Sequence, residues 1–197
     1  MQDLPDKIRA FVALRMSAEV ESAIAEFVHS LSELHSGIRW IRPANLHLTL
    51  CFLGDAVVHG VLLPLNQMLN KIAAQTVPFM LDARGTGAFP NLDRPRTLWI
   101  GLISEQLIRL AQQVEGAVAQ AGLVPEGRRY IPHLTIGRVR DLRGWQRIRD
   151  ALAQSSTQDF GSAQIAEMIL YRSILGGEAP QYQVLARYQL MGESPPK

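Results

Sequence analysis

Two four-residue segments of the chain, HLTL and HLTI, each carry a histidine followed two residues later by a threonine. The first segment contains His47 and Thr49, the second contains His133 and Thr135, and 86 residues separate the two histidines. If both segments are strands, each histidine shares a face with its threonine while the leucine between them lies on the other face. One face of each strand can therefore present an imidazole and a hydroxyl to a single ligand.

Strict alternation along the longer stretch NLHLTLCFLGD, residues 45–55, makes a further prediction. It places Cys51 on the same face as His47 and Thr49, and it places Phe52 on the opposite face with the leucines. The leucine face suits a hydrophobic core. The histidine face is the candidate for chemistry.

Two imidazoles that face one site suit proton transfer. Histidine titrates at about pH 6.5, so one ring can be neutral and accept a proton while its partner, beside a bound anion, is charged and donates one. The threonines add hydroxyl donors, and Arg138 follows His133 by five residues. Arg128, Arg129 and Arg140 make the second segment locally basic. Imidazole, hydroxyl and guanidinium together favour a tetrahedral anion, of which phosphate is the best candidate.

The absence of several motifs limits which reactions at such a phosphate are possible. The sequence contains no Walker loop and no carboxylate cluster for magnesium or zinc, so we expect neither a metal nor a cofactor. No serine or cysteine is marked as a nucleophile. Attack by water, with one histidine as base and the other as acid, remains, and this apparatus suits a reactive substrate such as a cyclic phosphodiester.

Composition limits the class of protein. The chain has 197 residues, 47% hydrophobic and 19% charged, which is typical of a soluble globular protein. A net charge of +2 argues against binding long nucleic acid through many phosphates. Cys51 is the sole cysteine, so neither a disulfide nor a zinc cluster is expected. The start MQDLPDKIRAFVALRM lacks the pattern of a secretory leader, and no segment suits a membrane span, so we expect a cytoplasmic protein.

The hydrophobic pattern predicts the elements that position the two segments. Arg9 opens a strand, helix and histidine strand and lies 38 residues before His47, and Arg96 opens the same series 37 residues before His133. Ser17 and Ser104 are the expected helix caps, and Gly122 ends the second of these helices. The predicted strands are 8–16, 46–53, 79–85, 96–102, 130–139, 164–174 and 182–190, and the other helices begin near residue 63, with Pro64 in the first turn, and near residue 144.

This recurrence predicts a duplicated fold. We expect two βαβ-type halves related by a pseudo-twofold axis, with a first repeat at about 8–85, a second at about 96–160 and closing strands at about 164–190, joined by the turn GGEAP. The 197 residues would form a single domain. Such an axis can place the two histidine faces on opposite sides of one cleft.

The chain also resembles a known family over nearly its whole length, from about residue 8 to 191. Its paired HLTL and HLTI segments resemble the signature of the two-histidine phosphoesterase superfamily. Within that superfamily, IRWIRPANLHLTLCFLGD, GTGAFPNLDRPRTLWIGL, PHLTIGRV and YQVLARYQL look like the bacterial RNA 2′,3′-cyclic phosphodiesterases, historically called 2′-5′ RNA ligases. The resemblance implies a bilobed α+β fold, rich in antiparallel sheet, around a central cleft.

The resemblance also implies an activity: hydrolysis of an RNA 2′,3′-cyclic phosphate end to a 2′-phosphate without a metal. His133 matches the position that activates water, and His47 matches the position that protonates the departing O3′. Thr49, Thr135 and Arg138 match phosphate-binding positions. No protein partner or membrane is implied, and we expect a monomer.

Phe52 has two interpretations. It matches a position that contacts the base together with Arg138, yet packing in the core on the Leu48 face is about equally well supported. Two positions depart from the family pattern. Cys51 stands where members often carry lysine, and Ile131 stands where a polar or basic residue is common.

Other functions stay open at this point. The same site could join RNA ends through 2′-5′ linkages or cleave 2′-5′ linked oligonucleotides. A protein of another class would hold RNA ends without turnover. The presence of both histidines and both threonines speaks against simple binding, because a binder needs hydrogen-bond donors but not a matched acid and base.

Overall fold

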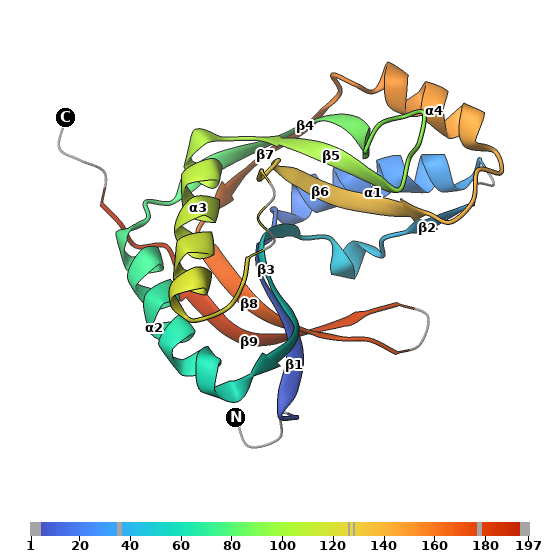
Figure 1. Cartoon of the computed structure of the whole chain (residues 1–197). Helices are drawn as coiled ribbons and strands as arrows, with labels where there is room; N and C mark the ends of the chain where they lie inside the picture. Colours follow the sequence, from blue (N-terminus) through green and yellow to red (C-terminus); the bar gives the residue numbers. More distant parts are fainter. Residues whose placement is uncertain (1–4, 35–36, 126, 128, 177–178, 194–197) are drawn as a thin grey trace.

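The structure, a computed structural model, describes residues 5–34, 37–125, 127, 129–176 and 179–193. The described residues form two antiparallel sheets and four α-helices (Figure 1). The α+β class and the antiparallel sheets predicted from the sequence are thus confirmed. Arg128 and part of the predicted GGEAP turn lie outside the described residues.

The four-stranded sheet has the order β3-β1-β8-β9. Its strands are β1 (Lys7–Leu14), β3 (Leu48–Val58), β8 (Glu167–Ile174) and β9 (Gln181–Gln189), and every neighbouring pair is antiparallel. β1 suits an inner position because seven of its eight residues are buried or half-buried, with the pattern eBiBBBBB. It pairs along the first histidine segment and holds that segment in the sheet.

The five-stranded sheet has the order β2-β6-β5-β4-β7. Its strands are β2 (Ile38–Trp40), β4 (Phe79–Phe89), β5 (Thr97–Ile103), β6 (His133–Val139) and β7 (Asp159–Ile165), and they too pair antiparallel. The second histidine segment lies in β6. Each sheet thus holds one of the two HLT segments.

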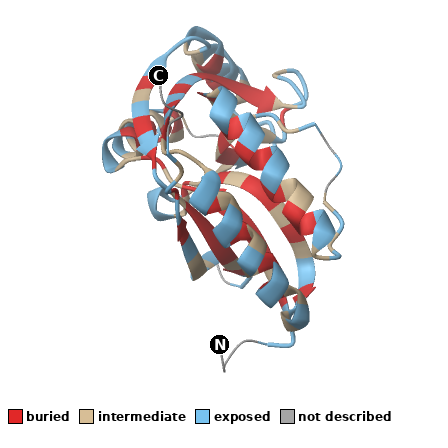
Figure 2. Cartoon of the chain, turned by 90° about the vertical axis from the view of Figure 1, so that its left-hand side faces the viewer, coloured by how far each residue is buried: buried red, intermediate tan, exposed pale blue. Residues whose placement is uncertain are grey.

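Strands and helices are exchanged between the halves of the chain. β1 pairs with β8 from the C-terminal part, while β5 pairs with β4 from the N-terminal part. The helix α1 (Ala18–Ser32) follows β1 but packs on β7, and α3 (Glu105–Gln120) follows β5 but packs on β3. This exchange joins the two sheets through one continuous core, and Figure 2 colours the buried positions red.

Two further helices complete the covering of the sheets. α2 (His59–Gln75) packs on α3 and β9, and α4 (Trp145–Gln154) packs on β4. The amide of Val20 donates to the side chain of Ser17, as expected for a helix cap, whereas Ser104 occupies the cap position without such a bond. Gly122 ends the third helix with a positive φ of 85°, as expected. Among the described residues, none of these helices is long and apolar enough to cross a membrane.

Several predicted boundaries are wrong. α2 begins at His59, so Pro64 lies inside the helix and not in its first turn. β3 continues past its predicted end at residue 53 to Val58, and β4 continues past its predicted end at residue 85 to Phe89. Residues 164–174 were expected to form one strand, but they hold the end of β7, a break at Ala166 and then β8. The short edge strand β2 was not predicted, because three residues give no readable alternation.

Candidate active site

A cleft of about 940 Å³ lies between residues of the two sheets. It is lined by all six residues that the sequence analysis assigns to catalysis or substrate binding: His47, Thr49, Phe52, His133, Thr135 and Arg138. Both imidazoles and both threonine side chains are half-buried, and Arg138 is exposed. The structure therefore brings the two HLT segments to one cavity, although 86 residues separate them in the chain.

Each histidine is oriented by the same backbone contact. His47 Nδ1 lies 2.7 Å from the carbonyl oxygen of Asn45, and His133 Nδ1 lies 2.7 Å from the carbonyl oxygen of Ile131. A carbonyl oxygen only accepts, so Nδ1–H is the donor in both rings. Nε2 is then the nitrogen that titrates, accepting a proton when the ring is neutral and donating one when it is charged.

A β-bulge follows each threonine. On β3, Cys51 pairs with Val12 and Thr49 pairs with Ala13, which leaves Leu50 without a partner on β1. On β6, Gly137 pairs with Leu98 and Thr135 pairs with Trp99, which leaves Ile136 without a partner on β5. An extra residue reverses the alternation of faces beyond it. The residue five positions after each histidine therefore returns to the histidine face.

This reversal corrects the faces that strict alternation predicts for the first segment. Phe52 lies opposite Phe11 and packs on the small cluster of Phe11, Ala13, Ile169 and Tyr171, on the same side as the His47 ring. Cys51, at 8% exposure, joins the main core with Leu48 and Leu50 instead of sharing the open histidine face, although it also borders the cleft. The prediction that Phe52 lies on the Leu48 face is wrong, and Phe52 and Arg138 occupy matching positions of the two strands.

Aromatic rings contact both imidazoles. The His47 ring lies 4.8 Å from the ring of Phe11 and 5.0 Å, edge to face, from that of Tyr182. The His133 ring meets Phe89 edge to face at 4.9 Å. Such contacts restrict how the imidazoles can tilt. Sequence reasoning missed these three residues, because they come from β1, β9 and the end of β4, far from either histidine in the chain.

The pKa of His47 is lowered from its ordinary value. Burial is the main cause, because it disfavours the charged ring, and the positive charges of Arg15 and Arg138 and the neighbouring His133 lower the pKa further. The hydrogen bond to Asn45 acts in the opposite direction and raises it. Without a bound anion, His47 is therefore predominantly neutral at neutral pH.

Two side chains tie the histidine segments to the rest of the cleft. The Tyr130 hydroxyl, three residues before His133, donates to the carbonyl oxygen of Thr49 at 3.2 Å, and burial raises the pKa of this tyrosine. The Asn45 amide donates to the carbonyl oxygen of Pro180 at 2.9 Å. The first bond links the first HLT segment to the residues just before the second one, and the second links the His47 segment to the β8–β9 hairpin.

The cleft is rich in positive charge. Of the described residues that line it, five are arginines and one, Glu115, is acidic. In the part of the chain that the structure describes, no three His, Cys, Asp or Glu side chains gather closely enough to hold a metal ion. The arrangement as a whole can bind an anion and can exchange protons with it from two titrating nitrogens.

Comparison with known proteins connects this geometry to a family. A family model described as LigT like phosphoesterase matches residues 14–99 and 100–174. Among curated proteins, an RNA 2′,3′-cyclic phosphodiesterase of Aquifex aeolicus is 30% identical over 94% of this chain and 98% of its own length. One of Archaeoglobus fulgidus is 32% identical over 92% of this chain and 100% of its own length.

Solved structures share the fold. The crystal structure of a Thermus thermophilus protein superposes with a TM-score of 0.82 at 27% identity, covering 95% of this chain and all of that chain. Escherichia coli LigT in complex with 3′-AMP superposes with a TM-score of 0.73 at 26% identity, covering 93% of this chain and 98% of that chain. That neighbour binds a nucleotide with a phosphate on the 3′ position.

Proposed function

The chain belongs to the LigT like phosphoesterase family, and from this premise we propose that it hydrolyses RNA 2′,3′-cyclic phosphodiester ends to 2′-phosphomonoesters. The observation that carries the proposal is the pair of imidazoles on one arginine-rich cleft, each with Nδ1 on a backbone carbonyl. The names of the curated relatives support the same reaction.

The proposed reaction needs one base and one acid on opposite sides of phosphorus. His133 Nε2 removes a proton from water as the water oxygen bonds to phosphorus. The bond from phosphorus to O3′ breaks, and His47 Nε2 gives its proton to that oxygen. The phosphate stays on O2′. Each proton transfer is worth about a hundred- to ten-thousand-fold in rate.

The remaining site residues stabilise the charge on phosphorus. Thr49 and Thr135 share the histidine faces and donate hydroxyl hydrogen bonds, and Arg138 reaches that side because of the bulge at Ile136. Phe52, at the matching position of β3, is proposed to contact the base. The Arg9 guanidinium lies 4.4 Å from the centroid of the Phe52 ring. The base would therefore contact the part of the ring that Arg9 leaves uncovered.

One chain supplies every group in this scheme. We propose that residues 1–197 act as one bilobed phosphoesterase domain and that a monomer is sufficient for turnover. The ligand is a nucleotide or RNA that ends in a 2′,3′-cyclic phosphate, with no metal or other cofactor. The cytoplasmic location stays a prediction.

The experiment that tests the activity is product analysis in EDTA. We expect a nucleoside 2′,3′-cyclic monophosphate, or RNA ending in one, to be hydrolysed with a 2′-monophosphate as the product in the phosphorus NMR spectrum. A 3′-monophosphate, or loss of activity on chelation, would contradict the mechanism. A new 2′-5′ diester would show ligation instead, and unchanged substrate would show a binding module.

The lowered pKa of His47 predicts how the rate depends on pH. As the acid, His47 must be charged, so kcat/KM, which reports the free enzyme, falls as pH rises through this lowered pKa. Bound phosphate offsets the positive charges of Arg15 and Arg138 and raises the pKa again. We therefore expect the alkaline limb of kcat to lie at higher pH than that of kcat/KM. Rates measured across pH at low and saturating substrate check this, and limbs that coincide would exclude His47 as the acid.

A further inference from the structure

The cleft is lined by more arginines than the proposed reaction uses. A 2′,3′-cyclic phosphodiester carries one negative charge, and the proposed scheme assigns only Arg138 to it. Arg9, Arg39, Arg96 and Arg129 also line the cleft, and Glu115 is the one acidic side chain among the described lining residues. A volume of about 940 Å³ leaves room for more than a ribose and its cyclic phosphate.

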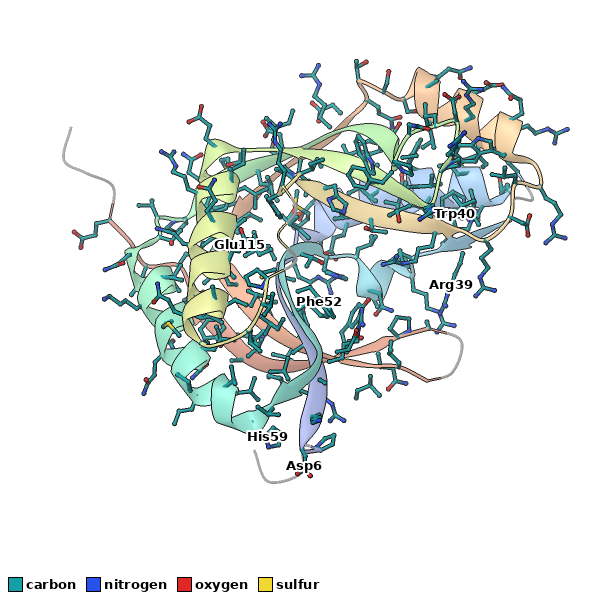
Figure 3. The ribbon with its side chains drawn as sticks, in the orientation of Figure 1. Asp6, Arg39, Trp40, Phe52, His59 and Glu115 are labelled. Carbon is teal, nitrogen blue, oxygen red and sulfur yellow. The ribbon has the colours of Figure 1, made fainter. Side chains whose placement is uncertain are left out.

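Two of these arginines are direct cross-strand neighbours. Arg39 on β2 pairs with Arg138 on β6, so both side chains lie on the same face of the five-stranded sheet. Like charges directly opposite each other on antiparallel strands are destabilising. Figure 3 labels Arg39 beside the short strand β2, at the edge of this sheet. An anion bound between the two guanidinium groups would offset this repulsion.

A third arginine and a hydroxyl complete the same region from the other sheet. Tyr182 on β9 lines the same cleft as Arg9, Arg39 and Arg138. Burial raises the pKa of its hydroxyl, and the charges of these three arginines each lower it. Arg9 comes from β1, where it pairs with Asp55 and stacks on Phe52, both of which fix its position. The cluster thus consists of side chains from four strands, β1, β2, β6 and β9.

We propose that Arg9, Arg39 and Tyr182, next to Arg138, form a second anion subsite that binds the phosphate on the 5′ side of the terminal nucleotide. This inference rests on the proposed function, because that function places the cyclic phosphate at the two histidines. One nucleotide then spans both subsites. The preferred substrate is an oligonucleotide end or a 5′-phosphorylated nucleotide, and a nucleoside cyclic phosphate with a free 5′-hydroxyl is a poorer substrate.

The test compares three substrates that share the cyclic end. These are adenosine 2′,3′-cyclic phosphate, the same compound with a 5′-monophosphate, and a diadenylate ending in the cyclic phosphate. We expect the second and third to exceed the first in kcat/KM by roughly tenfold or more, because charge-assisted hydrogen bonds to phosphate are worth that much. Arg39→Gln is expected to bring both ratios close to one, whereas Arg140→Gln, which removes the same charge from an exposed position outside the cleft, preserves them.

The three substrates also separate the possible results. An advantage shared by the monoester and the dinucleotide supports a phosphate subsite, and an advantage of the dinucleotide alone, unchanged in Arg39→Gln, overturns it in favour of base contacts. Equal kcat/KM for all three substrates overturns the subsite while leaving hydrolysis established. If no substrate is turned over, the proposed function fails. Calorimetry then tests the subsite alone, by comparing the affinities of adenosine 3′,5′-bisphosphate and 3′-AMP. Equal affinities for these two ligands would overturn the subsite as well.

Discussion

Replacing His133 by alanine is expected to lower kcat for a 2′,3′-cyclic phosphate by about a hundred- to ten-thousand-fold, because the attacking water loses its base. His47→Ala is expected to cause a loss of the same order, since the departing O3′ then leaves without a proton. KM should change less than kcat, because the threonines and Arg138 still hold the phosphate. Initial rates under single-turnover and steady-state conditions measure both quantities.

Folded controls separate loss of chemistry from loss of structure. His133→Asn keeps an amide that can donate to the Ile131 carbonyl but cannot titrate, so it should be as inactive as His133→Ala and retain the wild-type circular dichroism spectrum. His29→Ala removes a histidine that is 76% exposed on α1, and it should keep full activity. Normal turnover in a folded His47 or His133 variant would remove that residue from the mechanism.

The double variant provides a second test of the same scheme. If both proton transfers serve one displacement at phosphorus, the losses are not additive, and His47→Ala with His133→Ala together should be little slower than the worse single variant. Fully additive losses would indicate that the two histidines contribute to the rate independently of each other. The rate of the double variant under single-turnover conditions decides between these results.

Much of this site could be predicted from local patterns in the sequence. The HLT segments, the helices that follow β1 and β5, and the matching spacings from Arg9 to His47 and from Arg96 to His133 are all properties of nearby residues. Hydrophobic periodicity reads such features well, because core burial dictates the period of each element. The positions of Thr49 and Thr135 beside their histidines follow from one step of strand alternation.

Other parts depend on pairing between distant strands, which a single sequence does not reveal. The bulges at Leu50 and Ile136 exist only relative to β1 and β5, and they decide the faces of Phe52 and Arg138. Both residues after the threonines look like ordinary core positions. The sequence did contain one signal for these faces. Phe52 and Arg138 each lie five residues after a histidine, and in a repeated unit equivalent positions are expected to lie on equivalent faces.

The exchange of strands explains why other residues were missed. Tyr182 reaches His47 because β9 joins the N-terminal strands through β8, and Arg39 reaches Arg138 because β2 joins β6. These pairings have large sequence separations and no local signature. Similarly, β7 was merged with β8 in the prediction, because the single break at Ala166 is not marked by glycine or proline.

The aromatic support beneath His47 makes Phe11→Ala the substitution with the largest expected effect on stability. Phe11 is 5% exposed, and its ring lies 4.8 Å from His47, 5.1 Å from Tyr182 and 5.3 Å from Tyr171. Truncation leaves a cavity between the rings and should lower the free energy of unfolding by about 3–5 kcal/mol, measured by urea titration. It should also lower kcat, because the His47 ring gains freedom to tilt.

Phe11→Leu tests the orienting role without the full cavity. Leucine keeps most of the apolar volume, so the loss of unfolding free energy should be smaller, while the ring contact with His47 is still removed. We expect kcat to fall in both variants and KM to change little. Phe27→Leu is the matched control. Phe27 lies on α1 outside the cleft, and the centroid of its ring is 5.2 Å from that of Phe160, so its replacement should affect stability alone. Wild-type kcat in Phe11→Leu would show that the ring supports packing without orienting His47.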